Sequence, residues 1–147
     1  MPGDEQIATA IVNKCKLEED GSHLRVDAKF MADFLAIESN YLVAAYEGES
    51  PLGFALGYRM PCIWGRAYMM YVHEVGVIHS RRREGIGKRI MQAMIQVCKQ
   101  EGQLKLFLCT GVHNTSAIKL YTSVGGAPSP NDDPPLGFTW EFTGNNC

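Results

Sequence analysis

Hydrophobic and polar positions alternate along the chain in patterns that predict both strands and helices. Residues 7–15 fit either a strand or a short helix, whereas the apolar positions of 30–37 recur at helical spacing. Two short β-prone runs, 41–46 and 52–58, flank a polar turn and predict a hairpin. A longer strand is expected over 67–77, so these three strands should form an antiparallel meander.

The second half of the chain predicts a strand–helix–strand unit. A clear amphipathic helix begins near residue 86, and the near-continuous apolar run 104–109 after it is typical of a buried strand. Strand, helix and strand in this order form a βαβ unit with a right-handed crossover, so the strands on either side of the helix should be parallel. A short helix over 115–123, an acidic loop over 127–135 and a last strand over 136–142 follow. The expected apolar stripe of the long helix is Ile86, Ile90, Ala93, Met94 and Val97.

These elements predict a single α/β domain, 1–147, with a mixed sheet. Apolar residues make up 46% and charged residues 20% of the chain, which is a globular composition. The formal net charge of −2 argues against a nucleic-acid partner, and no apolar run is long enough to cross a membrane. The five cysteines include no CxxC pair, so we expect no metal site and reduced thiols in a cytoplasmic protein.

The first candidate site lies between the third strand and the long helix, where the sequence reads Arg82-x-x-Gly85-x-Gly87. Glycines in such a turn let backbone N–H groups face inward, and the helix N-terminus adds a partial positive charge. This is the arrangement that binds phosphate groups. The alternative is a tight turn with a solvated basic cluster, but three consecutive arginines, beginning at Arg81, favour the phosphate interpretation.

The second candidate pair is Asn114 and Tyr121, which are seven residues apart and should lie on one face of the short helix. An amide at the helix start and a phenol two turns later can both reach one elongated ligand. Taken alone, however, Asn114 is more simply explained as an N-cap and Tyr121 as a half-buried aromatic residue.

The third candidate is Glu74, within the strand 67–77. In a regular strand it shares a face with Met70 and Val72, and a carboxylate among apolar neighbours is a typical general base. The alternative is a strand-end carboxylate that faces water or pairs with an arginine of the next loop. His73 should point to the opposite face and is interpreted as structural.

Taken in chain order, these features resemble the GNAT superfamily of N-acetyltransferases. Within the stretch 41–142, residues 82–87 (Arg-Arg-Glu-Gly-Ile-Gly) are similar to the acetyl-CoA pyrophosphate motif of that family, and 114–121 to its second cofactor segment. The resemblance implies a mostly antiparallel mixed sheet with flanking helices. In this sheet a central pair of parallel strands splays apart to admit the pantetheine arm.

The resemblance also implies roles for individual residues, with acetyl-CoA as co-substrate and no metal. Glu74, directly or through water, would accept the proton of the amine, and Tyr121 would protonate the departing thiolate. Asn114 would bind the pantetheine arm. The remaining cofactor contacts would come from the strand and the following turn, at Val75, Val77, Arg82, Arg83, Gly85, Ile86, Gly87 and Lys88.

Within the superfamily, 120–126, the Asp132-Asp133 pair and 138–142 resemble the type I aminoglycoside 3-N-acetyltransferases. This implies an aminoglycoside acetylated at the 3-N position, or a similar small polycationic amine, with Asp132, Asp133 and Glu141 binding it. The alternatives are acetylation of a protein or peptide amine, and an acyl-CoA-binding module without catalysis. The last strand could also pair with a second copy in a homodimer.

Overall fold

The computed structural model of the chain describes residues 4–21, 25–131 and 136–142. Residues 7–15, which fitted a strand or a helix, are helical. The helices are α1 (Asp4–Asp20), α2 (Ala28–Leu35), α3 (Ile86–Gln100) and α4 (Thr115–Ser123), with a short 3-10 turn at His79–Arg81. The strands are β1 (Asn40–Glu47), β2 (Ser50–Cys62), β3 (Ala67–Val77), β4 (Lys105–Cys109), β5 (Ala127–Pro128) and β6 (Gly137–Glu141).

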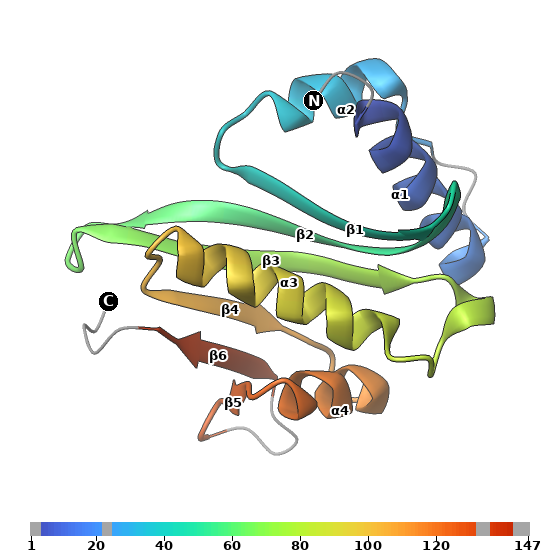
Figure 1. Cartoon of the computed structure of the whole chain (residues 1–147). Coiled ribbons are helices and arrows are strands. Elements are labelled where there is room, and N and C mark those ends of the chain that lie inside the picture. Colours follow the sequence, from blue (N-terminus) through green and yellow to red (C-terminus); the bar gives the residue numbers. More distant parts are fainter. Residues whose placement is uncertain (1–3, 22–24, 132–135, 143–147) are drawn as a thin grey trace.

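Within the described residues, the six strands form one mixed sheet in the order β1-β2-β3-β4-β6-β5 (Figure 1). Neighbouring strands are antiparallel except for β3 and β4, which are parallel and are connected through α3. The hairpin, the meander and the strand–helix–strand unit that the sequence predicts are confirmed. So is the α/β class with a mostly antiparallel sheet.

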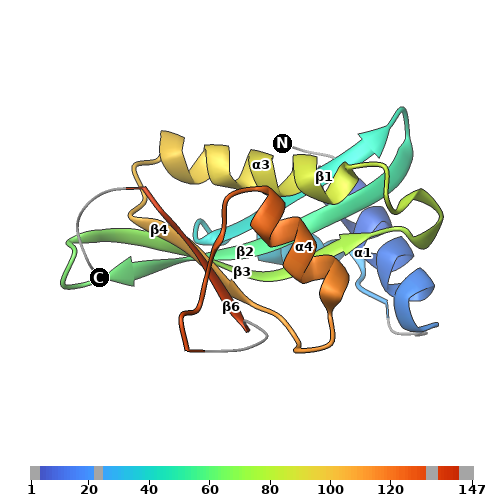
Figure 2. The same cartoon turned by 90° about the horizontal axis from the view of Figure 1, so that it is seen from below.

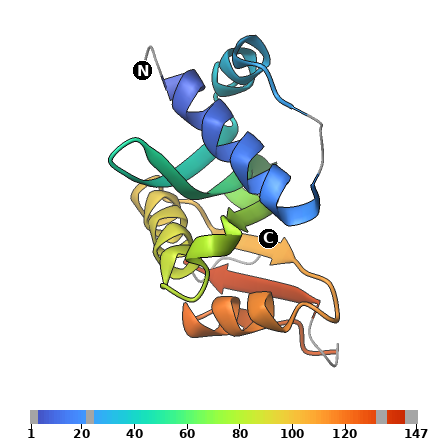
Figure 3. The ribbon, with the colours of Figure 1, turned by 90° about the vertical axis from the view of Figure 1, so that its right-hand side faces the viewer.

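Different helices cover the two faces of the sheet (Figure 3). On one face, a Cβ added at Gly76 in β3 would lie 3.5 Å from the Cβ of Cys15 in α1. On the other face, a Cβ added at Gly57 in β2 would lie 3.3 Å from the Cε of Met94 in α3. Helix α4 lies on the same side as α3. The sheet therefore separates an α1 face from an α3 face.

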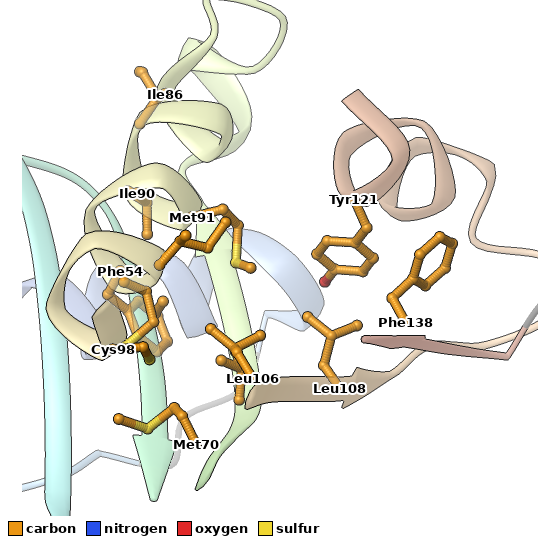
Figure 4. Close-up of a cluster of buried hydrophobic side chains, with 14 of the residues drawn as sticks. Phe54, Met70, Ile86, Ile90, Met91, Cys98, Leu106, Leu108, Tyr121 and Phe138 are labelled. Carbon is orange, nitrogen blue, oxygen red and sulfur yellow. The ribbon is translucent and has the colours of Figure 1, made fainter. Parts of the chain in front are cut away.

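The main hydrophobic core fills the space between the sheet and α3 (Figure 4). The predicted stripe of α3 is correct at three positions but wrong at Ala93, which is exposed, and at Val97, which is only partly buried. The helix is packed against both the sheet and the neighbouring α4, so it is buried along a wider arc than a single stripe. Cys98 on this helix is buried deeply enough that burial raises the pKa of its thiol to about 12. The buried residues of α3 are Ile86, Ile90, Met91, Met94, Ile95 and Cys98.

The cysteines depart from the sequence expectation at one position. Cys98 and Cys109 carry free thiols, whereas Cys62 takes part in a disulfide. The expectation of reduced thiols throughout is therefore wrong at Cys62, because spacing along the chain does not reveal which sulfurs meet after folding. The described residues contain no group of three or more His, Cys, Asp or Glu side chains that could hold a metal ion. In the same part of the chain, no helix has the length and apolar character to span a membrane.

Candidate active site

The parallel strands β3 and β4 are joined only near the start of β4. Their pairing is confined to 70–71 of β3 and 106–107 of β4. Beyond this point β4 continues beside β6 as far as Cys109, while β3 runs on to Val77 with no further pairing to β4 (Figure 2). The splayed parallel pair is thereby confirmed. We call the unpaired interval between β3 residues 72–77 and the end of β4 the strand gap.

The backbone groups of Val75 and Val77 face the strand gap. The amide of Ile78 donates a hydrogen bond to β2 at 2.9 Å, and backbone groups of an antiparallel strand point alternately to its two sides. Every second residue before Ile78 therefore bonds to β2, whereas Val75 and Val77 direct their N–H and C=O groups away from it. The Val77 carbonyl accepts a bond from Nε of Arg82 at 3.3 Å. An extended ligand could bond to this edge as an added strand would.

The arginine-glycine motif forms a tight turn at the N-terminus of α3. Arg83 and Gly85 have φ values of 67° and 76°, and Gly85 is the N-cap residue. A Cβ added at Gly85 would meet nothing within 4 Å, so the first turn of α3 opens onto free space. The first N–H groups of a helix have no partner within the helix and carry a partial positive charge. Together with the exposed side chains of Arg82 and Lys88, they make this end of α3 suited to an anion.

Arg81, the first of the three arginines, is engaged in ion pairs. Its guanidinium lies 3.0 Å from Glu47 at the end of β1 and 2.8 Å from Glu84 in the turn, and these carboxylates raise its pKa. Arg81 therefore fixes the turn to the first hairpin, and its charge is already paired with two carboxylates.

Helix α4 carries Asn114 and Tyr121, as the spacing predicts. Oδ1 of Asn114 accepts a hydrogen bond from the amide of Ala117 at 3.1 Å, so the N-cap interpretation is confirmed. This bond occupies only the oxygen of the Asn114 amide. The amide nitrogen can therefore serve a ligand without loss of the cap.

Tyr121 is buried rather than half-buried, with 7% of its surface exposed. Its ring centroid lies 5.5 Å from that of Phe138 and 6.3 Å from that of Trp140. Its hydroxyl points in the direction of Met91 and Leu108, beside the end of β4 (Figure 4). Burial raises the pKa of Tyr121 above its ordinary value of 10.0, so the phenol keeps its proton at neutral pH.

A β-bulge decides the face on which Glu74 lies. Val72 pairs with Gly57 of β2, but the next pair joins Glu74 to Leu56, so His73 is an extra residue in β3. Paired residues of antiparallel strands point to the same side, which places Glu74 with Leu56 and opposite Val72. The prediction that Glu74 shares a face with Val72 is therefore wrong, because one extra residue inverts the alternation.

The bulge also places His73 on the α1 face. Its imidazole centroid lies 6.0 Å from the ring of Tyr58 and 5.9 Å from that of Tyr71. The Tyr71 hydroxyl is 3.5 Å from Nδ1 of His73. The expectation that His73 and Glu74 point to opposite faces is therefore wrong. The run of apolar residues in β3 contains no signal from which the bulge could have been found.

Glu74 is half-buried and borders the strand gap on the α1 face. Among the described residues it forms no ion pair, since Arg81 of the next loop binds Glu47 and Glu84 instead. Glu74 and the Tyr121 hydroxyl thus approach the strand gap from opposite faces of the sheet.

Of the three residues predicted to bind the acceptor, the structure describes only Glu141. Asp132 and Asp133 lie outside the described residues. Glu141 is exposed. In the β4–β6 ladder its partner is Lys105 at the start of β4, where β3 and β4 are still joined. Glu141 therefore lies near the closed end of the parallel pair, whereas Glu74 lies at its open end.

Solved structures share this fold at low sequence identity. An aminoglycoside acetyltransferase from an uncultured soil metagenomic sample, meta-AAC0020, has a TM-score of 0.77 at 17% identity over 83% of this chain and 81% of its own. The ribosomal-protein-S18-alanine N-acetyltransferase of Escherichia coli has a TM-score of 0.68 at 16% identity over 99% and 92%. The PaiA N-acetyltransferase of Thermoplasma acidophilum, in complex with coenzyme A, has a TM-score of 0.67 at 10% identity over 94% and 92%.

The sequence itself matches a family. No curated protein sequence is significantly similar to the chain. The model of the Acetyltransferase (GNAT) family, however, matches residues 8–125, which span most of the chain. This range includes the arginine-glycine turn at the start of α3, the strand gap and the Asn114–Tyr121 helix. The chain therefore belongs to the GNAT family of acetyltransferases.

Proposed function

We propose that the protein transfers the acetyl group of acetyl-CoA to a primary amine by direct attack of the amine on the thioester. The strand gap carries this proposal. Its β3 edge offers backbone groups that do not bond to β2, and a carboxylate and a protonated phenol approach it from opposite faces. A proton acceptor on one side and a proton donor on the other are what amine acetylation needs.

The residues around the gap fit the parts of acetyl-CoA. Val75 and Val77 would bond to the pantetheine arm as a neighbouring strand would, and Arg82 would then release the Val77 carbonyl. The amide nitrogen of Asn114 would bind the same arm. The pyrophosphate would lie at the N-terminus of α3, on backbone N–H groups and cationic side chains of Arg82, Arg83, Gly85, Ile86, Gly87 and Lys88.

Three proton transfers complete the proposed reaction. Glu74, directly or through a water molecule, would take a proton from the ammonium form of the acceptor. The neutral nitrogen would then form the N–C bond of the amide while the C–S bond of the thioester breaks. Tyr121 would give its proton to the departing thiolate, whose thiol has an ordinary pKa of about 8.5. The second proton, which the nitrogen loses as the amide forms, would return to the Tyr121 phenolate, directly or through a water molecule. The raised pKa of the buried Tyr121 keeps that proton available at neutral pH.

The solved structures that share this fold support two classes of acceptor amine. A complex of meta-AAC0020 with sisomicin supports an aminoglycoside, which agrees with the resemblance to 3-N-acetyltransferases. The ribosomal-protein-alanine N-acetyltransferases support a protein amine instead.

A coenzyme A release assay tests the function. Purified protein is incubated with acetyl-CoA and, in turn, sisomicin, spermidine, phenethylamine and a peptide with an N-terminal alanine. Free coenzyme A is quantified by chromatography, because the exposed Cys109 would react with a thiol reagent. Release that depends on an amine supports the proposal. Tight acetyl-CoA binding without release for any amine would leave a binding module in its place.

Gly87 provides a test of the cofactor site. A Cβ at this position would lie 3.2 Å from Cδ2 of Leu120 in α4 and 3.6 Å from Cγ2 of Val77. Gly87→Val should push the start of α3 away from both and lower acetyl-CoA affinity at least about tenfold, ~1.4 kcal/mol. Calorimetric titration with acetyl-CoA measures this. Gly111→Val is the matched control, since a Cβ there meets nothing within 4 Å. Unchanged affinity in folded Gly87→Val would remove this turn from the site.

Asn114 allows capping and ligand binding to be separated. Asn114→Ala should lower the free energy of unfolding by about 1 kcal/mol, because the bond to the Ala117 amide is lost. Asn114→Ser keeps an oxygen for the cap but has no amide nitrogen, so it should retain stability and still bind acetyl-CoA about fivefold more weakly. Urea unfolding and acetyl-CoA titration measure the two effects. If the Ser variant binds acetyl-CoA normally, Asn114 is a cap only.

A further inference from the structure

Five aromatic rings form a continuous row on the α1 face of the sheet. Phe34 of α2 contacts Tyr58 of β2, with ring centroids 6.2 Å apart. Tyr58 lies 6.0 Å from His73, and His73 lies 5.9 Å from Tyr71. Tyr71 lies 5.3 Å from Phe107 of β4, with the two planes inclined by 30°. We call Phe34, Tyr58, His73, Tyr71 and Phe107 the aromatic row.

The aromatic row ends beside the strand gap. Tyr71 and Phe107 are the last paired residues of β3 and β4 before these strands separate, and Glu74 follows the bulge on the same face. The aromatic row is accessible to solvent, because Tyr58, Tyr71 and Phe107 are partly exposed and His73 is exposed. A ligand that approaches the gap from the α1 face would therefore meet these rings.

Charge along the three strands that carry the row is sparse. Glu74 is the one carboxylate in the described strands β2, β3 and β4. Of the three carboxylates predicted to bind the acceptor, Glu141 lies near the closed end of β3 and β4, and Asp132 and Asp133 lie outside the described residues.

Of the two cations in these strands, Arg59 pairs with Met70 and lies on the α3 face, where it contacts Glu38 at 3.3 Å and the ring of Tyr68 at 4.7 Å. Lys105 is the strand partner of Glu141 near the closed end. A polycation with several ammonium groups finds one carboxylate on these strands, whereas a single ammonium on an apolar body is matched by one carboxylate and several rings.

We propose that the acceptor is a small arylalkylamine, one primary amine on a short chain attached to an aromatic ring. This rests on the proposed function and names its second substrate. The ring of the acceptor packs on Tyr71 and Phe107, while the amine lies at Glu74 by the mouth of the strand gap. Tyr71 and Glu74 are two regular steps and one bulge residue apart, roughly 7 Å along the strand. A benzene ring with a two-carbon amine arm has about this length.

The test compares four acceptors on the purified protein with saturating acetyl-CoA: phenethylamine, n-hexylamine, spermidine and sisomicin. Phenethylamine should have the highest kcat/KM, by at least about tenfold over both polycations and several-fold over the ringless monoamine. Tyr71→Leu and Phe107→Leu keep an apolar side chain but remove a ring. Each should raise the KM for phenethylamine about five- to tenfold and leave the acetyl-CoA dissociation constant unchanged.

A control variant separates the loss of a ring in the aromatic row from the general effect of a Tyr-to-Leu change. Tyr46→Leu removes an exposed tyrosine of β1 that is not part of the aromatic row, and it should change nothing. Thermal unfolding of every variant shows whether it is folded.

Preference for phenethylamine together with the loss in the Leu variants supports the proposal. Preference for spermidine or sisomicin, or Leu variants with an unchanged KM, would overturn it and leave the acetyltransferase function standing. If no amine is acetylated, the proposed function itself fails. Calorimetric titration of phenethylamine in the presence of coenzyme A then decides the site: binding that weakens in the Leu variants supports the aromatic row as its binding surface, and no binding overturns it.

Discussion

Replacing Glu74 with Gln is expected to lower kcat about 10²-fold at pH 7, with a larger loss at lower pH. The Gln side chain keeps the shape and much of the polarity of Glu but cannot accept a proton. The variant must then use amine that is already neutral in solution, and that fraction falls as pH decreases below the amine pKa of about 10. A pH profile of kcat/KM from 6 to 10, with the best amine of the panel, measures this.

The control for this prediction is Glu49→Gln in the turn between β1 and β2. Glu49 is an exposed glutamate that lies away from the strand gap, so its replacement should leave the pH profile unchanged. A Glu74→Gln variant that retains the parent rate at pH 6 would show that another group, or solvent alone, removes the proton.

Replacing Tyr121 with Phe is expected to lower turnover about 10²-fold while the KM for acetyl-CoA stays near the parent value. The ring contacts with Phe138 and Trp140 are kept, and only the proton donor is lost. The raised pKa of Tyr121 adds a second expectation. Activity of the parent protein should fall on the alkaline side only above pH 10, as the phenol ionises, and this decrease should be absent from the variant.

Steady-state kinetics from pH 7 to 11 distinguish a proton donor from a packing residue. Tyr46→Phe is the matched control, because Tyr46 is an exposed tyrosine on β1. If Tyr121→Phe turns over at the parent rate, the hydroxyl takes no part in the reaction and Tyr121 only fills the core between α4 and β6.

The sequence predicts those structural features whose conformation is determined by residues close together in the chain. The turn before α3 needs backbone freedom at Gly85, and the start of α4 needs an oxygen at Asn114, so both could be found from the residues alone. The parallel relation of β3 and β4 follows from the connection through α3, because a helix between two strands returns the chain to the end of the sheet from which the first strand started. In these cases the physical cause lies within a few residues or in a general rule of chain geometry.

Features that depend on strand register could not be found in this way. The face on which Glu74 lies is set by one extra residue, His73, and only the pairing with β2 reveals it. The aromatic row joins residues from α2, β2, β3 and β4, and no spacing in the sequence links Phe34 to Phe107. Where side chains of distant segments meet is decided by the packed structure.

Glu74 and the start of α3 lie on opposite faces of the sheet at the strand gap, and this has a kinetic consequence. The nucleotide end of acetyl-CoA would bind at the start of α3, whereas the amine would approach from the face that carries Glu74, so neither substrate blocks the path of the other. Both can be present together, which implies intersecting rather than parallel lines in double-reciprocal plots. A single molecule that joins an aryl amine to coenzyme A through the gap would occupy both positions at once. Because the second contact is then made at high effective concentration, such a bisubstrate compound should bind far more tightly than either half.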